Sequence, residues 1–258
     1  MALLLLQYGL SQTAKPGRGS PAVLGCLLGG AVVLAAWAWW ELRTEQPAVD
    51  LRVIGDRSMW PVQLTAMLFA ISLSGSQSPD STFLAADPER TGYGFGLDTT
   101  GIALITLPSQ IASVTGAALH SRLAARAGPH RTIATGAALL AVGYGALCVA
   151  HGGPASFAVT VTLVGCGVGL MSGGFPSLVA ERAPADRAGI AAGVYDTLRT
   201  LAGGIAGGLF AVVLSSSVLL AGSPLPSAGA YRVVWLACAV PGLAAAGLVL
   251  FARRRTAD

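Results

Sequence analysis

The sequence predicts an all-α fold: a polytopic bundle of about seven transmembrane helices. The first observation is composition, since only 11% of the 258 residues are charged, 53% are hydrophobic and the mean hydropathy is +0.67. A soluble domain usually carries about 25% charged residues, so this chain has too little polar surface to cover a water-soluble globule. The second observation is a series of apolar runs, each about long enough to cross a bilayer. Soluble enzymes, disordered chains and coiled coils are therefore excluded.

Residues 1–20 are expected to hold the end of a truncated helix and an external connection. The apolar stretch Ala2–Leu10 would reach only about 14 Å as a helix, which is too short to span a membrane. It also lacks the positive start and the small-residue cleavage site of a signal peptide. We expect it to be the tail of a helix that begins outside this chain.

Residues 21–258 form the predicted transmembrane bundle. A bilayer core about 30 Å thick needs about 20 helical residues, and the runs of this length lack Asp, Glu, Lys and Arg. The exception is the sixth run, whose helix we expect to begin before its apolar core. The predicted spans lie near residues 21–40, 59–79, 98–120, 132–151, 155–180, 188–214 and 231–252. Helices are favoured over barrel strands because the polarity of these runs does not alternate.

The connections between the spans alternate in arginine content, and this alternation predicts an orientation. The richer side holds Arg43, Arg52, Arg57, Arg122, Arg126, Arg131, Arg182, Arg187, Arg253, Arg254 and Arg255. The poorer side holds Lys15, Arg18, Arg90 and Arg232, with Asp80, Asp87, Glu89 and Asp98 in the connection over 80–98. The positive-inside rule places the richer side in the cytoplasm. We predict a multi-pass plasma-membrane protein with its C-terminus inside the cell.

The sixth span carries two ionisable residues, Asp196 and Arg199. They are three positions apart, so they share a helix face and can pair. Ionisable groups at membrane depth usually face a bundle interior or an aqueous cavity. This pattern is typical of a protonation or substrate-contact site. A neutralised pair near the cytoplasmic helix end, which only fixes helix packing, is the alternative.

Three glycine pairs with small-xxx-small spacing lie on the same span and predict close packing against another helix. They are Gly189 and Gly193, Gly203 and Gly207, and Gly204 and Gly208. A sliding or rocking helix interface is the functional alternative.

A short basic turn is expected between the third and fourth spans. Its residues are Arg122, Leu123, Arg126, Gly128 and Arg131. Gly128 can adopt the positive φ that ends a helix, and the arginines favour the negative end of the helix dipole. Taken alone, the cluster is explained by the positive-inside rule.

Gln110 is a polar residue two positions after Pro108 inside the third span. A buried amide needs a partner, so we consider Gln110 a candidate substrate contact. The four cysteines lie in apolar runs without metal-ligand spacing, and no catalytic or nucleotide-binding motif occurs in a fitting context. We therefore expect no enzyme activity, no metal, no cofactor and no nucleic-acid partner.

The order of these motifs resembles the fourteen-helix drug:proton antiporters of the major facilitator superfamily. Segment 41–52 resembles the connection after their eighth helix, segment 94–108 their tenth-helix entry and segment 187–204 their thirteenth helix. Leu123, Arg126, Gly128 and Arg131 match the second copy of the family's cytoplasmic loop motif. Ser121 and Ala125 replace its Gly and Asp. The family usually has Asn at the position of Asp196.

The resemblance covers nearly the whole chain and implies the C-terminal half of such a transporter. It implies a proton-coupled exporter of small hydrophobic or cationic molecules, embedded in the lipid bilayer and completed by a missing N-terminal half. In this superfamily the substrate path lies between the two halves. The alternatives are a truncated, non-transporting membrane remnant, or one half of a two-chain transporter.

Overall fold

The computed structural model describes residues 60–182, 188–216 and 226–254, together with a few isolated helical positions between 29 and 43. The predicted segment 1–20 and most of the predicted span 21–40 lie outside the described residues. The helices are α3 (Trp60–Ala85), α4 (Pro88–Thr91), α5 (Thr99–Ala127), α6 (Pro129–Leu147), α7 (Pro154–Arg182), α8 (Ala188–Ser216) and α9 (Ala228–Arg254). Every element of this described part of the chain is an α-helix.

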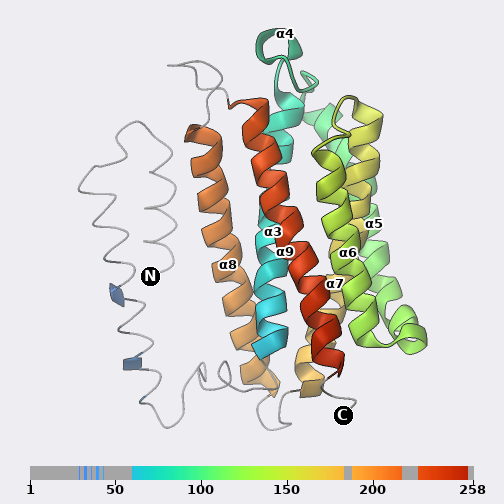
Figure 1. Ribbon diagram of the computed structural model, residues 1–258, viewed down its shortest axis with the longest axis vertical. Coiled ribbons are helices and arrows are strands. Elements are labelled where there is room, and N and C mark those ends of the chain that lie inside the picture. The colour runs from blue at the N-terminus through green and yellow to red at the C-terminus, as the bar shows by residue number, and fades with distance from the viewer. Residues whose placement is uncertain are drawn as a thin grey trace.

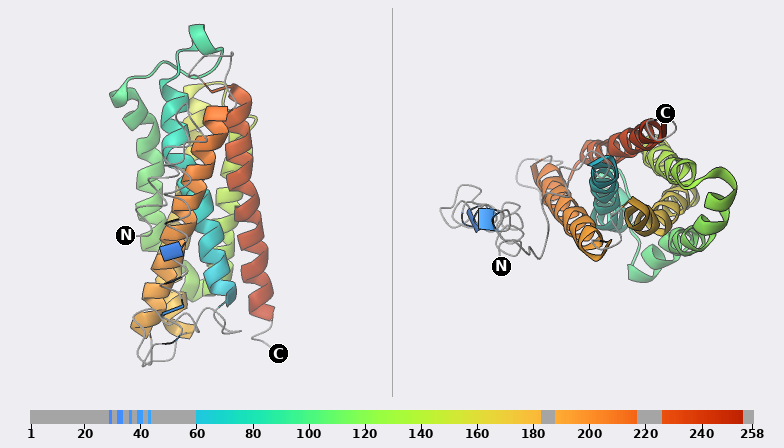
Figure 2. Two further views of the ribbon diagram at one scale, coloured as in Figure 1. Left: turned by 90° about the vertical axis from the view of Figure 1, so that its left-hand side faces the viewer. Right: turned by 90° about the horizontal axis from the view of Figure 1, so that it is seen from below.

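The six long helices stand side by side as one bundle (Figure 1). Helix α8 packs mainly against α3, which packs against α9. Helix α9 continues the series to α6, and α6 packs against α7, whose other neighbour is α5. Seen end on, α8 and α5 therefore lie at opposite sides of the described bundle (Figure 2).

Four of these helices are long and apolar enough to cross a membrane: α5, α7, α8 and α9. Helix α3 has a shorter apolar stretch, Trp60–Leu73, and α6 begins with the polar segment Pro129-His-Arg131. The predicted number of seven spans is thus not confirmed by the described residues. The prediction of an all-helical, multi-pass architecture is confirmed.

The third predicted span ends at residue 120, but helix α5 continues to Ala127. Arg122 and Arg126, predicted for a turn, therefore extend α5, where positive charge is favourable at the C-terminal end of the helix dipole. Arg131 lies in the first turn of α6. Gly128 is the single connecting residue, with φ of 87°. Its N–H donates to the carbonyl of Ala124 at 2.8 Å, and Pro129 begins α6.

Helix α7 approaches both of its neighbours at glycines. A Cβ at Gly169 would lie 2.9 Å from the Cα of Ser113 on α5, and a Cβ at Gly173 would lie 2.8 Å from the carbonyl oxygen of Ala117. On the α6 side, a Cβ at Gly136 would lie 3.0 Å from the carbonyl oxygen of Gly167. These positions require glycine because backbone atoms of the neighbouring helix occupy the space of a side chain.

Buried aromatic side chains hold one end of the bundle together, at the end that carries α4. We call this group the outer aromatic cluster, since the sequence predicts that this end faces outside; its members are Phe83, Tyr93, Phe95, Phe157, Tyr231 and Trp235. Phe83 lies at its centre, with its ring centroid 5.2 Å from that of Trp235 and 5.3 Å from that of Tyr231. The cluster joins α3, α7 and α9.

Candidate functional site

The Asp196–Arg199 pair on α8 is the centre of the candidate site. Arg199 Nη2 donates to Asp196 Oδ1 at 3.0 Å, so the two residues form the ion pair that their spacing predicts. The Asp196 side chain is 64% exposed and that of Arg199 35% exposed. Asp196 therefore lies on the side of α8 that no other described helix covers, called the open side below, whereas Arg199 is half-buried toward α3. Ala191, Val194 and Tyr195 form the buried face of α8 near the pair.

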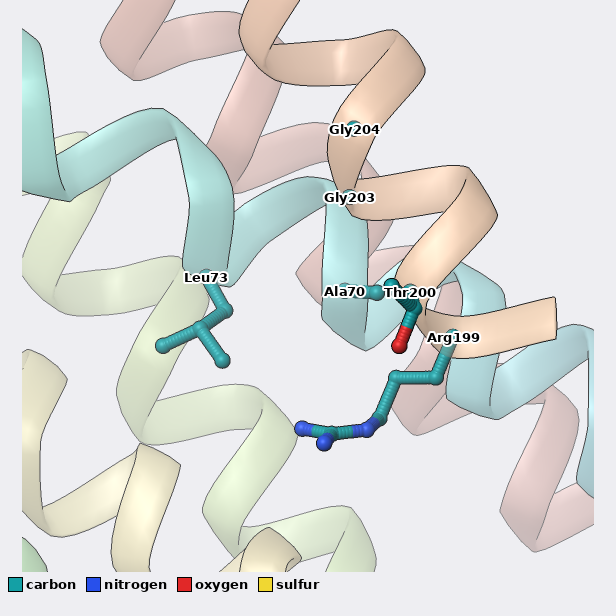
Figure 3. A pocket seen from close by; sticks show the side chains of 6 residues that line it. All are labelled: Ala70, Leu73, Arg199, Thr200, Gly203 and Gly204. Atoms are coloured by element: carbon teal, nitrogen blue, oxygen red, sulfur yellow. The ribbon is translucent and has the colours of Figure 1, made fainter. Parts of the chain in front are cut away.

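A groove of about 210 Å³ runs between α3 and α8 beside this pair. Its lining residues are Ala70, Leu73, Arg199, Thr200, Gly203 and Gly204. Figure 3 shows the Arg199 side chain extending from α8 toward the Leu73 side of the groove. Gly203 and Gly204 keep part of the α8 wall free of side chains, and the polar side chains of the lining are those of Arg199 and Thr200.

Arg199 has donor capacity that Asp196 does not use. Its Nε is buried and has no hydrogen-bond partner among the described residues. A guanidinium carries five N–H donors, and an unsatisfied buried donor costs about 1–3 kcal/mol. A polar or anionic group could therefore bind Arg199 in the groove. A proton or a cation could bind the Asp196 carboxylate.

The predicted packing glycines of α8 fall into two groups. A Cβ at Gly189, Gly193 or Gly207 would have nothing within 4 Å among the described residues. Gly203 and Gly204 line the groove, and Gly208 is half-buried. The structure thus places these glycines on the open side of α8 or at the groove, and their packing role stays a prediction.

Gln110 is exposed on α5, near Leu107 and Ile111, which are also exposed. Helix α5 packs mainly against α7, on the side of the bundle opposite to α8. The structure therefore does not bring Gln110 to the Asp196–Arg199 pair within this chain.

The residues of the basic motif gather around the α5–α6 connection. Arg122, Leu123, Arg126 and Arg131 are exposed, and Gly128 is half-buried. They lie at the end of the bundle where α9 ends and α8 begins (Figure 1).

Sequence reasoning missed one buried acid, Asp80. It was assigned to the external connection, but α3 continues through Pro79 to Ala85, and Asp80 is only 7% exposed. Trp235 Nε1 donates to Asp80 Oδ1 at 2.9 Å. No local signal could reveal this contact, because its partners are 155 positions apart. The glycines of α7 were also missed, although Gly165, Gly169 and Gly173 have the spacing that was noted for α8.

No group of three or more His, Cys, Asp or Glu side chains that could hold a metal ion occurs within the described residues.

Comparisons with known proteins agree with the helical bundle. The family model described as Major Facilitator Superfamily matches residues 2–208. Two curated relatives, both named "Multidrug resistance protein Stp" and from the CDC 1551 / Oshkosh and ATCC 25618 / H37Rv strains of Mycobacterium tuberculosis, are each 25% identical over 217 residues. The match covers 84% of this chain and 39% of either relative. The chain thus spans about two fifths of the length of these relatives.

Proposed function

The chain belongs to the Major Facilitator Superfamily, a family of transporters and not of enzymes, and we propose that it is the rear half of a proton-coupled exporter. The proposed substrates are small hydrophobic or cationic molecules. The observation that carries the proposal is the Asp196–Arg199 pair beside the groove between α3 and α8. The multidrug-resistance name of the two relatives supports this substrate class.

Exchange is proposed to occur at the Asp196 carboxylate. A proton from outside binds Asp196 and cancels its charge, which weakens its ion pair with Arg199 and its attraction for a cationic substrate. Release of that proton to the cytoplasm restores the carboxylate, which pairs again with Arg199 or attracts the next cation. A proton and a cationic substrate thus compete for one group, and this competition couples their opposite movements.

The open side of α8 is proposed to face a partner half of the transporter. Gly189, Gly193 and Gly207 leave gaps between the side chains on that side, and a second bundle could approach closely there. Such a half would supply the other wall of the substrate path, since in this type of fold the path lies between two halves. Gln110 is proposed to face the path or the lipid from α5.

The proposed location is the plasma membrane, with the C-terminus in the cytoplasm. The exposed arginines Arg122, Arg126 and Arg131 lie at the same end of the bundle as the end of α9. The positive-inside rule assigns that end to the cytoplasm.

The coupling role is tested by Asp196→Asn in proteoliposomes that contain the chain together with a front half. With a fluorescent lipophilic cation as the probe, we expect an imposed proton gradient to drive uptake with the wild type and not with Asp196→Asn. Asp196→Glu should retain uptake because it keeps a titratable carboxyl. Glu89→Gln, at an exposed acid of α4, is the matched control. Equal uptake by Asp196→Asn and the wild type would remove Asp196 from the mechanism.

A further inference from the structure

Asp80 is a buried carboxyl group that the proposed transport step does not use. It lies in α3 beyond Leu73, where the apolar stretch of this helix ends. The described residues contain no ion pair between Asp80 and a basic side chain, and Asp80 accepts a hydrogen bond from the neutral indole N–H of Trp235. Trp235 itself is fully buried.

The outer aromatic cluster lies beside this carboxyl, which is 7% exposed, and meets it through Trp235. Phe83, one turn after Asp80 in α3, is 1% exposed and touches the Trp235 ring. The Tyr231 hydroxyl donates to Thr82 Oγ1 at 3.3 Å, which adds a second link between α3 and α9. While these contacts hold, the low exposure of Asp80 leaves a charge on it with little hydration.

A carboxylate in such a place is costly without a cation, because it loses hydration and gains one hydrogen bond from the described residues in return. Burial accordingly raises the pKa of Asp80 to about 7, and the hydrogen bond from Trp235 partly opposes this shift. An exposed aspartate titrates near 3.8.

Other titratable groups lie around this carboxyl on each neighbouring element. They are Tyr231 and Cys238 on α9, Tyr144 and Cys148 on α6, His151 before α7, and Tyr93 after α4. Arg232 on α9 is exposed. The His151 ring lies 5.5 Å from that of Trp235, so it faces the same indole as Asp80. Any experiment must therefore separate Asp80 from His151.

We propose that Asp80 is a proton-binding site that keeps α3 against α9 while it is protonated. Ionisation strengthens the bond from Trp235 but leaves the rest of the carboxylate without hydration, so this end of the bundle opens to admit water to the charge. Protonation closes it again. This inference concerns the chain itself and does not depend on the proposed transport function.

The hydrogen bond to Trp235 provides a direct readout, since an indole beside a titrating carboxyl changes its fluorescence. In the purified full chain, we expect tryptophan emission to change between about pH 6 and about pH 8, with a midpoint near 7. Asp80→Asn keeps a hydrogen-bond acceptor for the indole but cannot titrate, so its emission should stay constant over this range. Trp235→Phe should lose the change, because it removes the reporter.

His151→Gln is the matched control and should keep the wild-type titration. The proposal is overturned if Asp80→Asn still titrates, if His151→Gln does not, or if wild-type emission is constant. Infrared difference spectroscopy on the wild type needs no variant to fold. It should show the carbonyl stretch of a protonated carboxyl at about pH 6 that is lost at about pH 8, since exposed carboxyls ionise at lower pH; absence of that band overturns the proposal as well.

Discussion

Two aspartates in this chain have the same chemistry and opposite surroundings. Asp196 has a guanidinium at 3.0 Å and is 64% exposed, whereas Asp80 has a neutral indole N–H at 2.9 Å and is 7% exposed. The first pair was predictable from sequence, because residues three apart on a helix meet by geometry alone. The second was not, because the contact between Asp80 and Trp235 exists only after α3 and α9 have packed.

The raised pKa of Asp80 has a consequence for stability. Between its ordinary value of 3.8 and its folded value of about 7, the folded chain holds a proton that the unfolded chain releases. Stability therefore falls as the pH rises through this range, and the favourable contribution is complete only below the unfolded pKa. We expect thermal unfolding of the wild type in detergent to shift to lower temperature between about pH 5 and about pH 8.

Asp80→Asn should remove most of this pH dependence, since the amide does not titrate. The same scans on Glu89→Gln, at an exposed acid, should follow the wild type. Parallel curves for Asp80→Asn and the wild type would show that Asp80 does not cause the dependence.

At the scale of the helices, the sequence predicted where each helix lies along the chain better than it predicted which helices pack together. Long apolar runs locate the helices because a bilayer imposes a length. Helix ends were less predictable: α3 and α5 both continue past the predicted boundaries at residues 79 and 120. A helix can continue past its apolar run into polar residues, because its backbone N–H and C=O groups bond to each other whatever the side chains are. Gly128 was the exception, because a positive φ is a local requirement.

The glycines of α7 and α8 have similar spacing and different surroundings, which permits a matched comparison. Gly169→Ala places a methyl group against the backbone of Ser113, so we expect a loss of about 1–3 kcal/mol from overpacking. Gly207→Ala meets nothing within 4 Å among the described residues and should be neutral or stabilising by up to about 1 kcal/mol through helix propensity. Thermal unfolding of both variants in detergent measures the difference.

If Gly169→Ala unfolds at the wild-type temperature, α5 and α7 do not approach at that glycine. If Gly207→Ala is the more destabilised variant, the open side of α8 is already packed within the chain.

At the scale of the whole molecule, the described bundle has two different sides. Helix α5 exposes Leu104 and Val114 at 65% and 71%, which suits lipid. Helix α8 exposes Asp196 and a glycine-rich surface, which suits a partner. The order in which helices α8, α3, α9, α6, α7 and α5 pack could not be read from the sequence, because any of the apolar helices could have been neighbours.

The central claim is that this chain is one half of a transporter, and reconstituted transport tests it most directly. Uptake of a fluorescent lipophilic cation would be measured in proteoliposomes under a proton gradient, with the chain alone and with the chain plus the first seven helices of a related full-length transporter. We predict uptake only when both parts are present. Equal uptake by the chain alone would contradict the claim by showing a complete transporter, and no uptake with either preparation would contradict it by showing a non-transporting remnant.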